Sequence, residues 1–291
     1  MAKTTADAFN EFKAKLVLTD NQRQAINSRR DATINYVKTA FPPGSDLPFK
    51  AGHLIGSASR GTIIRPLDDI DLMVTFTNKD NVFEKYRRDS HAFLYRIRDA
   101  LKASSRVEVV GARGQVVRFF YKDAPHVDIA PMFKWNEAGY GLPEGTGGWI
   151  TTDPDFHAEY FSKRDAELDS RLKPMMRMLK RWNRVHSRYL KSFHLEVIVS
   201  AAFGSIGSDS RAACEKFFEW APNHLDVKDP AGYSGVLSAY LTSTARRSAL
   251  TNMESARDRA AKANAAELRG NHDEAMRLWR ITFGDEFPAY G

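Results

Sequence analysis

The feature that most constrains the fold is the segment Asp69 to Phe76, in which polar and apolar residues alternate. Successive side chains of a strand point to opposite faces of a sheet, so the alternation predicts a strand with one face on a core. The apolar face would carry Ile70, Leu72, Val74 and Phe76. The opposite face would carry Asp69, Asp71, Met73 and Thr75. The segment therefore predicts two carboxylates that point away from the core.

Two carboxylates on one face of a strand can bind a metal ion. Mg²⁺ is a hard cation that prefers oxygen ligands and shares them with substrate phosphates, and Mn²⁺ suits the same ligands. A third carboxylate, Asp128, lies in a strand-like segment in which Val127 and Ile129 point the opposite way. We therefore predict a metal site at Asp69, Asp71 and Asp128. Such a set is typical of two-metal catalysis, in which the ions lie about 4 Å apart.

The alternative is that these aspartates are solvated charges at the edge of a strand, which is the preferred interpretation of an isolated Asp-x-Asp. Two further signals favour the metal site, namely the Gly56-Ser57 pair that precedes Asp69 and the later Asp128. Asp68 is excluded as a ligand, because alternation points its side chain away from that of Asp69.

The Gly56-Ser57 pair predicts the end of a strand and the beginning of a turn or short helix. Glycine lets the backbone approach a phosphate closely, and exposed amides together with the Ser57 hydroxyl could bind its oxygens. Arg60 lies in the same loop. Two roles are open for it, a contact with phosphate and an ion pair with Asp68.

A basic stripe is predicted on a later helix, because four cationic residues recur there at intervals of three or four, at Lys173, Arg177, Lys180 and Arg184. Such a stripe is either a solvated face or part of a cleft that neutralises a triphosphate. Lys180 is the first candidate for a phosphate ligand.

A further helix is predicted to begin near Lys191, which places Ser192 at its N-terminus, where a hydroxyl and free amides favour an anion. An ordinary capping role for Ser192 is compatible with this. Phe193 could stack on a nucleobase or belong to the core, and the sequence favours neither. His194 is interpreted as structural.

The order of the predicted elements indicates an α+β fold with a mixed lobe followed by a helical lobe. Helices are predicted over the first forty residues, with Asp20 as a cap, and over 81–102 and 166–187. Strands are predicted over 106–110, 115–121 and 126–133, and a Gly- and Pro-rich loop over 135–154. We expect a catalytic lobe, residues 1–150 with the N-terminal helices, a helical lobe, residues 151–291, and an active site in the cleft between them.

Composition limits the classes of function. The 43 Lys and Arg residues exceed the 36 Asp and Glu residues by seven, which suits an anionic ligand such as a nucleotide. Cys214 is the only cysteine, so an intramolecular disulfide and a thiolate zinc cluster are excluded. The sequence has no apolar stretch long enough to span a membrane and no apolar leader, so we expect a cytoplasmic protein that contacts no membrane.

Taken together, these residues resemble the polymerase-beta-like nucleotidyltransferase superfamily, whose signature is Gly-Ser, a spacer, Asp-x-Asp and a distant third Asp. More narrowly, they resemble the bacterial relatives of cyclic GMP-AMP synthase, the CD-NTases of the CBASS anti-phage systems. The resemblance spans about residues 50–288, and the segments that carry it are Gly56–Thr62, Asp69–Leu72, Gly147–Ile150, Asp153-Pro154, Leu179–Asn183, Lys191–Glu196 and Trp279–Pro288.

The resemblance implies a two-lobed, Mg²⁺-dependent enzyme that joins nucleoside triphosphates such as ATP into cyclic di- or trinucleotide second messengers. It implies that Asp69, Asp71 and Asp128 are the metal ligands and that Ser57, Lys180 and Ser192 hold triphosphate. Phe193 stands where the animal relative has a tyrosine that stacks on a base. That keeps the stacking surface and loses a hydroxyl.

The zinc-binding insertion of the animal enzyme has no counterpart here, so no DNA activator is expected. We expect a monomer. Some family members are conjugated through the C-terminus by a ubiquitin-like ligase, and the end of this chain, Phe287 to Gly291, would be the exposed segment for such a reaction.

Two other functions remain open. A different nucleotidyltransferase, which tails RNA or modifies a protein or drug, would share the metal site. A nucleic-acid-binding module that uses the basic helix would leave the aspartates incidental and would bind in a strongly salt-dependent way. The aspartates argue against the module, because they would repel a phosphate backbone unless metals were bound.

Overall fold

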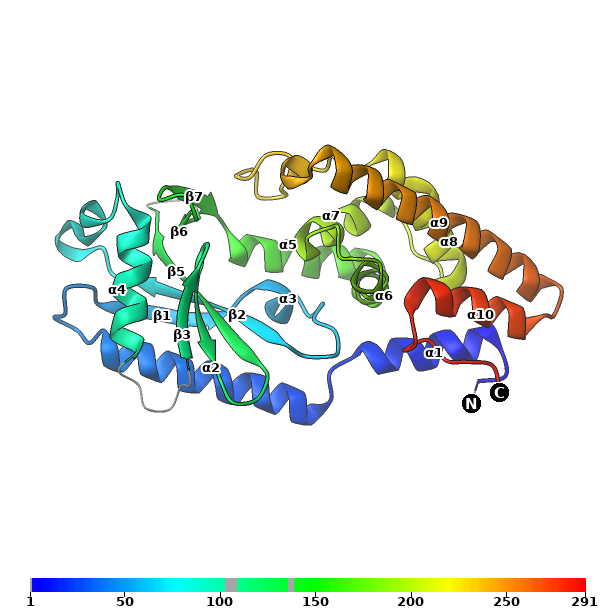
Figure 1. Cartoon of the computed structure of the whole chain (residues 1–291), viewed down its shortest axis with the longest axis horizontal. Helices are drawn as coiled ribbons and strands as arrows, with labels where there is room; N and C mark the ends of the chain where they lie inside the picture. The colour runs from blue at the N-terminus through cyan, green and yellow to red at the C-terminus, as the bar shows by residue number, and fades with distance from the viewer. Residues whose placement is uncertain (1, 103–108, 136–138) are drawn as a thin grey trace. The chain divides into compact units, whose positions relative to one another are not determined.

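The computed structural model describes residues 2–102, 109–135 and 139–291 (Figure 1). Contacts divide the chain into two compact units. We call the first the sheet unit, which comprises Thr19–Arg60 and Pro66–Glu159. The second, the helical unit, comprises the chain as far as Leu18, Gly61–Arg65 and Tyr160–Gly291. The division differs from the expected boundary near residue 150, because the first helix and a short segment after the Gly-Ser loop belong to the helical unit.

The sheet unit is built on a mixed sheet, as the sequence predicts. Its strands are β1 (Phe49–Leu54), β2 (Asp69–Phe76), β3 (Val109–Arg113), β4 (Val116–Phe120), β5 (His126–Lys134), β6 (Tyr140–Pro143) and β7 (Trp149–Thr152). The order is β1-β2-β5-β4-β3, and β6 joins β5 to β7. β2 and β5 are parallel, whereas the other neighbours are antiparallel.

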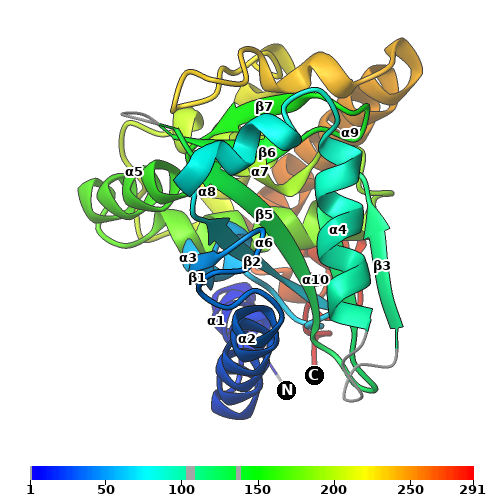
Figure 2. The same ribbon diagram turned by 90° about the vertical axis from the view of Figure 1, so that its left-hand side faces the viewer.

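Helices α2 (Asp20–Ala40) and α4 (Ser90–Lys102) pack on the apolar face of this sheet, and Figure 2 shows α4 beside the strands. Phe76 anchors the packing, with ring centroids 5.3 Å from Phe41 and 5.6 Å from Phe93 at nearly perpendicular angles. A smaller cluster, which includes Met73 and Met132, covers the other face. Only the beginning of β2, where Asp69 and Asp71 lie, is therefore left for polar chemistry.

Three expectations about this unit are corrected. Thr19, and not Asp20, caps α2, because its hydroxyl accepts from Gln22 N while the Gln22 side chain accepts from Thr19 N. The helix expected over 81–102 begins only at Ser90 and is preceded by a 3-10 turn, Lys79–Lys85.

The loop expected over 135–154 is instead the β6–β7 hairpin, in which Pro143 pairs with Trp149. The Trp149 ring packs against Phe83 and Phe93, so tertiary packing of an aromatic side chain overrides the Gly- and Pro-rich composition. Of the strand expected over 106–110, residues 106–108 lie outside the described residues.

The helical unit contains α1 (Thr5–Leu16), α6 (Leu172–Val185), α7 (Ser192–Ala202), α8 (Ser210–Trp220), α9 (Ser243–Leu268) and α10 (His272–Phe283), and the later part of α5 (Pro154–Glu167). The helix expected over 166–187 is two helices, because Asp169 and Ser170 take the left-handed φ values 53° and 59° and interrupt it. The expected beginning of the next helix near Lys191 is confirmed by α7.

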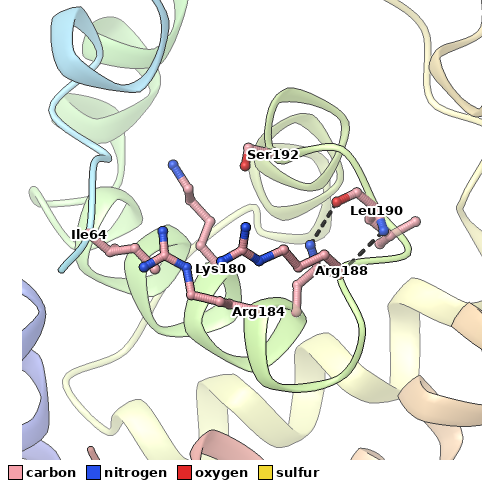
Figure 3. Close-up of a pocket in the computed structure, with 7 residues that line it drawn as sticks. Ile64, Lys180, Arg184, Arg188, Leu190 and Ser192 are labelled. Atoms are coloured by element: carbon pink, nitrogen blue, oxygen red, sulfur yellow. Dashed lines mark hydrogen bonds between the residues drawn. The ribbon is translucent and has the colours of Figure 1, made fainter. Parts of the chain in front are cut away.

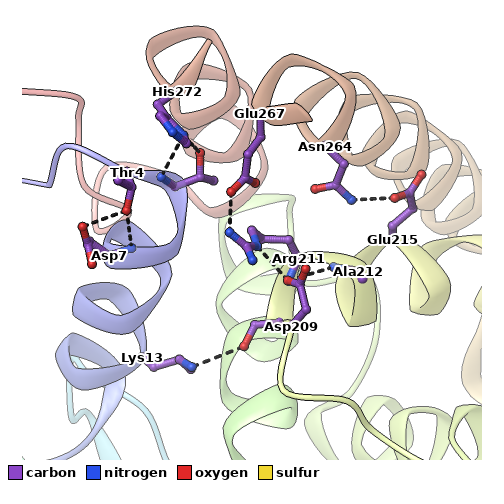
Figure 4. A network of polar contacts seen from close by, with 12 residues as sticks. Thr4, Asp7, Lys13, Asp209, Arg211, Ala212, Glu215, Asn264, Glu267 and His272 are labelled. Carbon is purple, nitrogen blue, oxygen red and sulfur yellow. Dashed lines mark hydrogen bonds and ion pairs between the residues drawn. The ribbon is translucent and has the colours of Figure 1, made fainter. Parts of the chain in front are cut away.

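An aromatic cluster joins the beginning and the end of this unit. Phe287 is fully buried and lies 5.1 Å from Phe9 and 5.3 Å from Phe12 between ring centroids. The expectation that the segment from Phe287 is exposed is therefore wrong at Phe287, although Tyr290 is 49 % exposed. Polar contacts also link α8 to α9, where Arg211 pairs with Asp209 and Glu267 (Figure 4). Among the described residues, no helix is long and apolar enough to cross a membrane.

Candidate active site

The structure brings the three predicted aspartates together at the beginning of two parallel strands. Asp71 of β2 lies directly beside Asp128 of β5 in the register of the pair, and Asp69 lies two residues earlier on the same face. The register follows from the apolar side chains, since Leu72 and Ile129 must both reach the core. Asp128 is 8 % exposed, whereas the Asp69 side chain is 48 % exposed and therefore partly shielded from water. Asp68 precedes β2, is exposed, and has no partner in the register of the two strands, although its charge also raises the pKa of Asp69.

Arg118 of β4 is a member of this cluster that the sequence analysis missed. It is the antiparallel partner of Asp128 in the register. Its Nε lies 2.5 Å from Asp128 Oδ1, its Nη2 donates to Asp128 Oδ2, and the same Nη2 lies 3.1 Å from Asp69 Oδ2. The two strands were predicted, over 115–121 and 126–133, but neither segment alone gives the register that pairs Arg118 with Asp128.

The electrostatics of the cluster follow from this proximity. Burial raises the pKa of Asp69, and the neighbouring Asp128 carboxylate raises it further, while Arg118 opposes both effects. The hydrogen bonds to Asp128 raise the pKa of Arg118, which is charged at any physiological pH. Several negative groups are therefore held close together and depend on a cation for neutralisation.

The Gly56-Ser57 pair lies against Asp71. It begins α3 (Gly56–Ser59), a short helical turn after β1, and Ile55 N donates to Asp71 O over 2.9 Å. A Cβ on Gly56 would lie 2.1 Å from Asp71 Oδ2, and φ at Gly56 is +64°. Only glycine fits this position, and the predicted short helix after the strand is confirmed, whereas the approach to phosphate stays a prediction. Ser57 is half-buried, and Arg60, at the end of the turn, is buried.

The donor set suits a hard divalent cation, because Asp69, Asp71 and Asp128 supply carboxylate oxygens and Gly56 leaves room beside one of them. Within residues 2–102, 109–135 and 139–291, however, no three acidic, histidine or cysteine side chains stand in a ready-made metal-binding group. Arg118 donates to carboxylate oxygens of Asp128 and Asp69, two of the three predicted ligands. The residues fit a metal ion once that contact is broken.

Two of the residues predicted to hold phosphate, Lys180 and Ser192, lie in the helical unit. Lys180 is 8 % exposed, and its Nζ donates to Glu196 Oε1 and to Thr62 O, each over 2.9 Å. Glu196 is fully buried and also accepts from the Thr62 hydroxyl over 2.6 Å. The basic stripe is therefore not merely a solvated face, since Arg177 also donates to Gly61 O over 2.8 Å. Both cations hold the Gly61–Arg65 segment.

A cavity of about 80 Å³ opens beside Lys180 (Figure 3). Its lining is largely cationic and polar and consists of Ile64, Lys180, Asn183, Arg184, Arg188, Leu190 and Ser192. Ser192 is the first residue of α7, as predicted, and is exposed. Asn183 fixes the turn before it, because its side chain donates to Leu190 O over 2.7 Å and accepts from Leu190 N. Arg188, which the sequence analysis missed, lies in that turn with a φ of 51°.

Phe193 is half-buried beside this helix end, and its ring centroid lies 6.2 Å from that of Phe161 in an edge-on contact. Both interpretations of Phe193 stay open. His194 is buried, with Nε2 2.7 Å from Leu225 O and Nδ1 3.1 Å from the Tyr240 hydroxyl. These contacts account for His194 as a structural residue.

A comparison with protein families identifies the chain. The model for the Second Messenger Oligonucleotide or Dinucleotide Synthetase domain matches residues 3–165, more than half of the sequence. The chain belongs to this family. It is thus a nucleotidyltransferase of the CD-NTase family of cyclic nucleotide synthases, as its motifs predicted.

Relatives support the same assignment. The chain is 26 % identical to a probable cyclic nucleotide synthase of Bacillus cereus, over 100 % of this chain and 99 % of that protein. It is 25 % identical to a cyclic AMP-AMP-AMP synthase of an Acinetobacter species, over 81 % and 72 % of the two chains.

The fold of the CD-NTase matches solved structures. The CdnC protein of Escherichia coli in its HORMA complex superposes with a TM-score of 0.79 at 18 % identity, over 98 % of both chains. The Vibrio cholerae DncV cyclic AMP-GMP synthase, solved with a linear intermediate, gives 0.78 at 14 % identity, over 100 % and 98 %. The polymerase-beta-like α+β fold expected from the sequence is confirmed.

Proposed function

We propose that this CD-NTase joins nucleoside triphosphates, ATP among them, and cyclises the product to a cyclic di- or trinucleotide second messenger for anti-phage defence. The observation that carries the proposal is the register that places Asp71 beside Asp128 and Asp69 on the same face, against Gly56. Family membership indicates a cyclic nucleotide product. A place in the cytoplasm, a monomeric state and C-terminal conjugation stay predictions.

In each step a 3′- or 2′-hydroxyl of one nucleotide attacks the α-phosphorus of another. The new O–P bond forms as the bond from the α-phosphorus to the bridging oxygen breaks, and pyrophosphate leaves with the electron pair. Asp128 is placed to take the proton of the hydroxyl, as a base or through a ligand contact. A second attack within the linear intermediate closes the ring and releases a second pyrophosphate when the product is a dinucleotide.

Asp69, Asp71 and Asp128 would hold Mg²⁺ or Mn²⁺. When bound, the metal supplies activation of the hydroxyl and neutralisation of the leaving pyrophosphate. Ser57 beside Gly56 and the cavity of the helical unit supply donors for the phosphates. In that cavity, the cations of Arg184 and Arg188 and the hydroxyl of Ser192 suit phosphate oxygens.

The test is to incubate the protein with all four nucleoside triphosphates and Mg²⁺, treat the mixture with phosphatase, and examine it by mass spectrometry. A phosphatase-resistant cyclic product is expected from the wild type, and none from Asp69→Asn or Asp71→Asn. Asp68→Asn is the matched control, because its exposed carboxylate lies outside β2, and it should keep activity. Linear products, or a requirement for RNA, would instead indicate another transferase.

A further inference from the structure

Arg118 makes a contact that the proposed reaction does not require. Its guanidinium bonds both carboxylate oxygens of Asp128 and reaches Asp69 Oδ2 at 3.1 Å. These oxygens belong to two of the three side chains assigned as metal ligands. An arginine fork matches a carboxylate in two places at once, so this is the strongest type of side-chain ion pair.

The sheet builds this contact. Arg118 and Asp128 are direct partners on antiparallel strands, so their side chains leave the same face a few ångströms apart. The Cζ of Arg118 also lies 5.7 Å from the centre of the Phe120 ring. The Arg118 side chain is 32 % exposed and that of Asp128 is 12 % exposed, so water can reach the pair only in part.

The described carboxylates form no ready-made metal group, and Arg118 bonds oxygens of two of them. A divalent cation and the guanidinium need the same oxygen atoms, and both cannot bind them at once. The cation carries the larger charge, whereas the arginine is covalently attached and already in place. Their competition lowers the affinity of the protein for a free metal ion.

We propose that Arg118 is a displaceable counter-ion of the catalytic aspartates. It positions Asp69 and Asp128 and neutralises them in the metal-free protein, and it leaves their oxygens when a metal ion binds. A metal that arrives with a nucleotide gains further contacts, so the nucleotide complex displaces Arg118 more readily than the free ion does. The inference rests on the proposed function only for the assignment of the three aspartates as metal ligands.

The test measures Mn²⁺ binding by calorimetry without nucleotide, so that it does not depend on activity. We expect Arg118→Met to bind Mn²⁺ about tenfold or more tightly than the wild type, because a positive charge close to the site is gone. Arg118→Lys keeps the positive charge and loses the two-point contact with Asp128, so we expect it to bind Mn²⁺ about threefold more tightly than the wild type. Arg98→Met is the matched control, since Arg98 pairs with Asp99 on α4, and it should leave the affinity unchanged.

A second readout is thermal unfolding in EDTA and in Mn²⁺. Arg118→Met should lower the midpoint in EDTA, because Asp69 and Asp128 then repel each other, and Mn²⁺ should raise it more than in the wild type. If Arg118→Met fails to fold, Arg118→Lys decides the question by its affinity.

Unchanged Mn²⁺ affinity in both Arg118 variants would overturn the role of Arg118. If Asp69→Asn still abolished Mn²⁺ binding in that case, the metal ligands and the proposed function would stand. If the wild type and Arg118→Met both bound no Mn²⁺, the assignment of the ligands would fail and the inference would fall with it.

Discussion

At the scale of single residues, Gly56 is a position that tolerates little change. Its backbone has a left-handed φ, and its Cα faces the carboxylate of a predicted metal ligand. Gly56 therefore has to be glycine for two reasons, its left-handed backbone and the lack of space for a Cβ, whereas only the first reason applies to Gly61. That difference allows the two effects to be measured separately.

We predict that Gly56→Ala reduces product formation by about a hundredfold, because the methyl group would lie 2.1 Å from Asp71 Oδ2 and would displace that carboxylate or the loop. Gly61→Ala is the control. It has a similar φ of +69°, but its nearest contact for a Cβ, Lys173 Cδ, is 3.7 Å away. It incurs only the backbone strain of about 1 kcal/mol. Rates would be measured by release of pyrophosphate. Equal loss in both variants would assign the effect to backbone strain alone.

At the scale of elements, the sequence predicted what depends on local periodicity. The two faces of β2, the parity that selects Asp69 and Asp71 over Asp68, and the beginning of α7 all follow from side-chain spacing along one segment. The β6–β7 hairpin and the break after α5 were missed. Trp149 folds against Phe83, far away in the sequence, and the left-handed φ values of Asp169 and Ser170 leave no signal in a helical stripe.

The residues of the candidate site also fall into those that local periodicity predicts and those that depend on contacts between distant segments. Asp128 and Ser192 could be proposed because each lies on a periodic element. Arg118 depends on the register between β4 and β5, and Arg188 depends on a turn fixed by the Asn183 side chain. The burial of Lys180 against Glu196 joins two helices and a segment more than a hundred residues earlier, so no local pattern reveals it.

The buried pair of α6 and α7 leads to a second prediction. Glu196→Gln should lower the free energy of unfolding by about 3 kcal/mol, because it leaves the Lys180 ammonium buried without its counter-charge. Lys180→Gln should cost a similar amount. The double variant should lose less than the sum by at least about 1 kcal/mol, since the two groups interact directly.

The measurement is urea unfolding of four proteins, namely the wild type, Glu196→Gln, Lys180→Gln and the double variant. Lys15→Gln is the control, because Lys15 pairs with Glu11 at 3.1 Å on the exposed surface of α1, and a change below about 1 kcal/mol is expected there. Additive losses at Lys180 and Glu196 would mean that neither residue depends on the other.

At the scale of the whole molecule, the helical unit is tied together by contacts between its earliest and latest segments. Phe287 packs on Phe9, and two histidines, the half-buried His186 and the buried His194, make further tertiary contacts. His186 Nε2 lies 3.0 Å from Thr282 O and joins α6 to α10, while His194 joins α7 to Leu225. Their stability contribution depends on the imidazoles staying neutral.

This dependence predicts how stability changes with pH. Burial lowers the pKa of both His186 and His194 below the ordinary value of about 6.5. Above that value both are neutral whether folded or unfolded, so their contribution is fully present. As the pH falls below about 6.5, the unfolded chain binds protons at these histidines before the folded chain does, so the free energy of unfolding decreases. The decrease ends once the pH is below the lower pKa of the folded state. The slope approaches about 1.4 kcal/mol per pH unit for each histidine.

Urea unfolding between pH 7.5 and pH 5.5 measures this loss, since most carboxylates titrate only below that range. The variant His186→Gln/His194→Gln should be less stable at pH 7.5 and nearly independent of pH over the interval. His224→Gln, an exposed histidine of the same unit, should keep the slope of the wild type. A double variant with the full wild-type slope would show that other groups bind the protons. Because His186 and His194 each contact a carbonyl oxygen of another segment, their protonation lowers the stability of the helical unit.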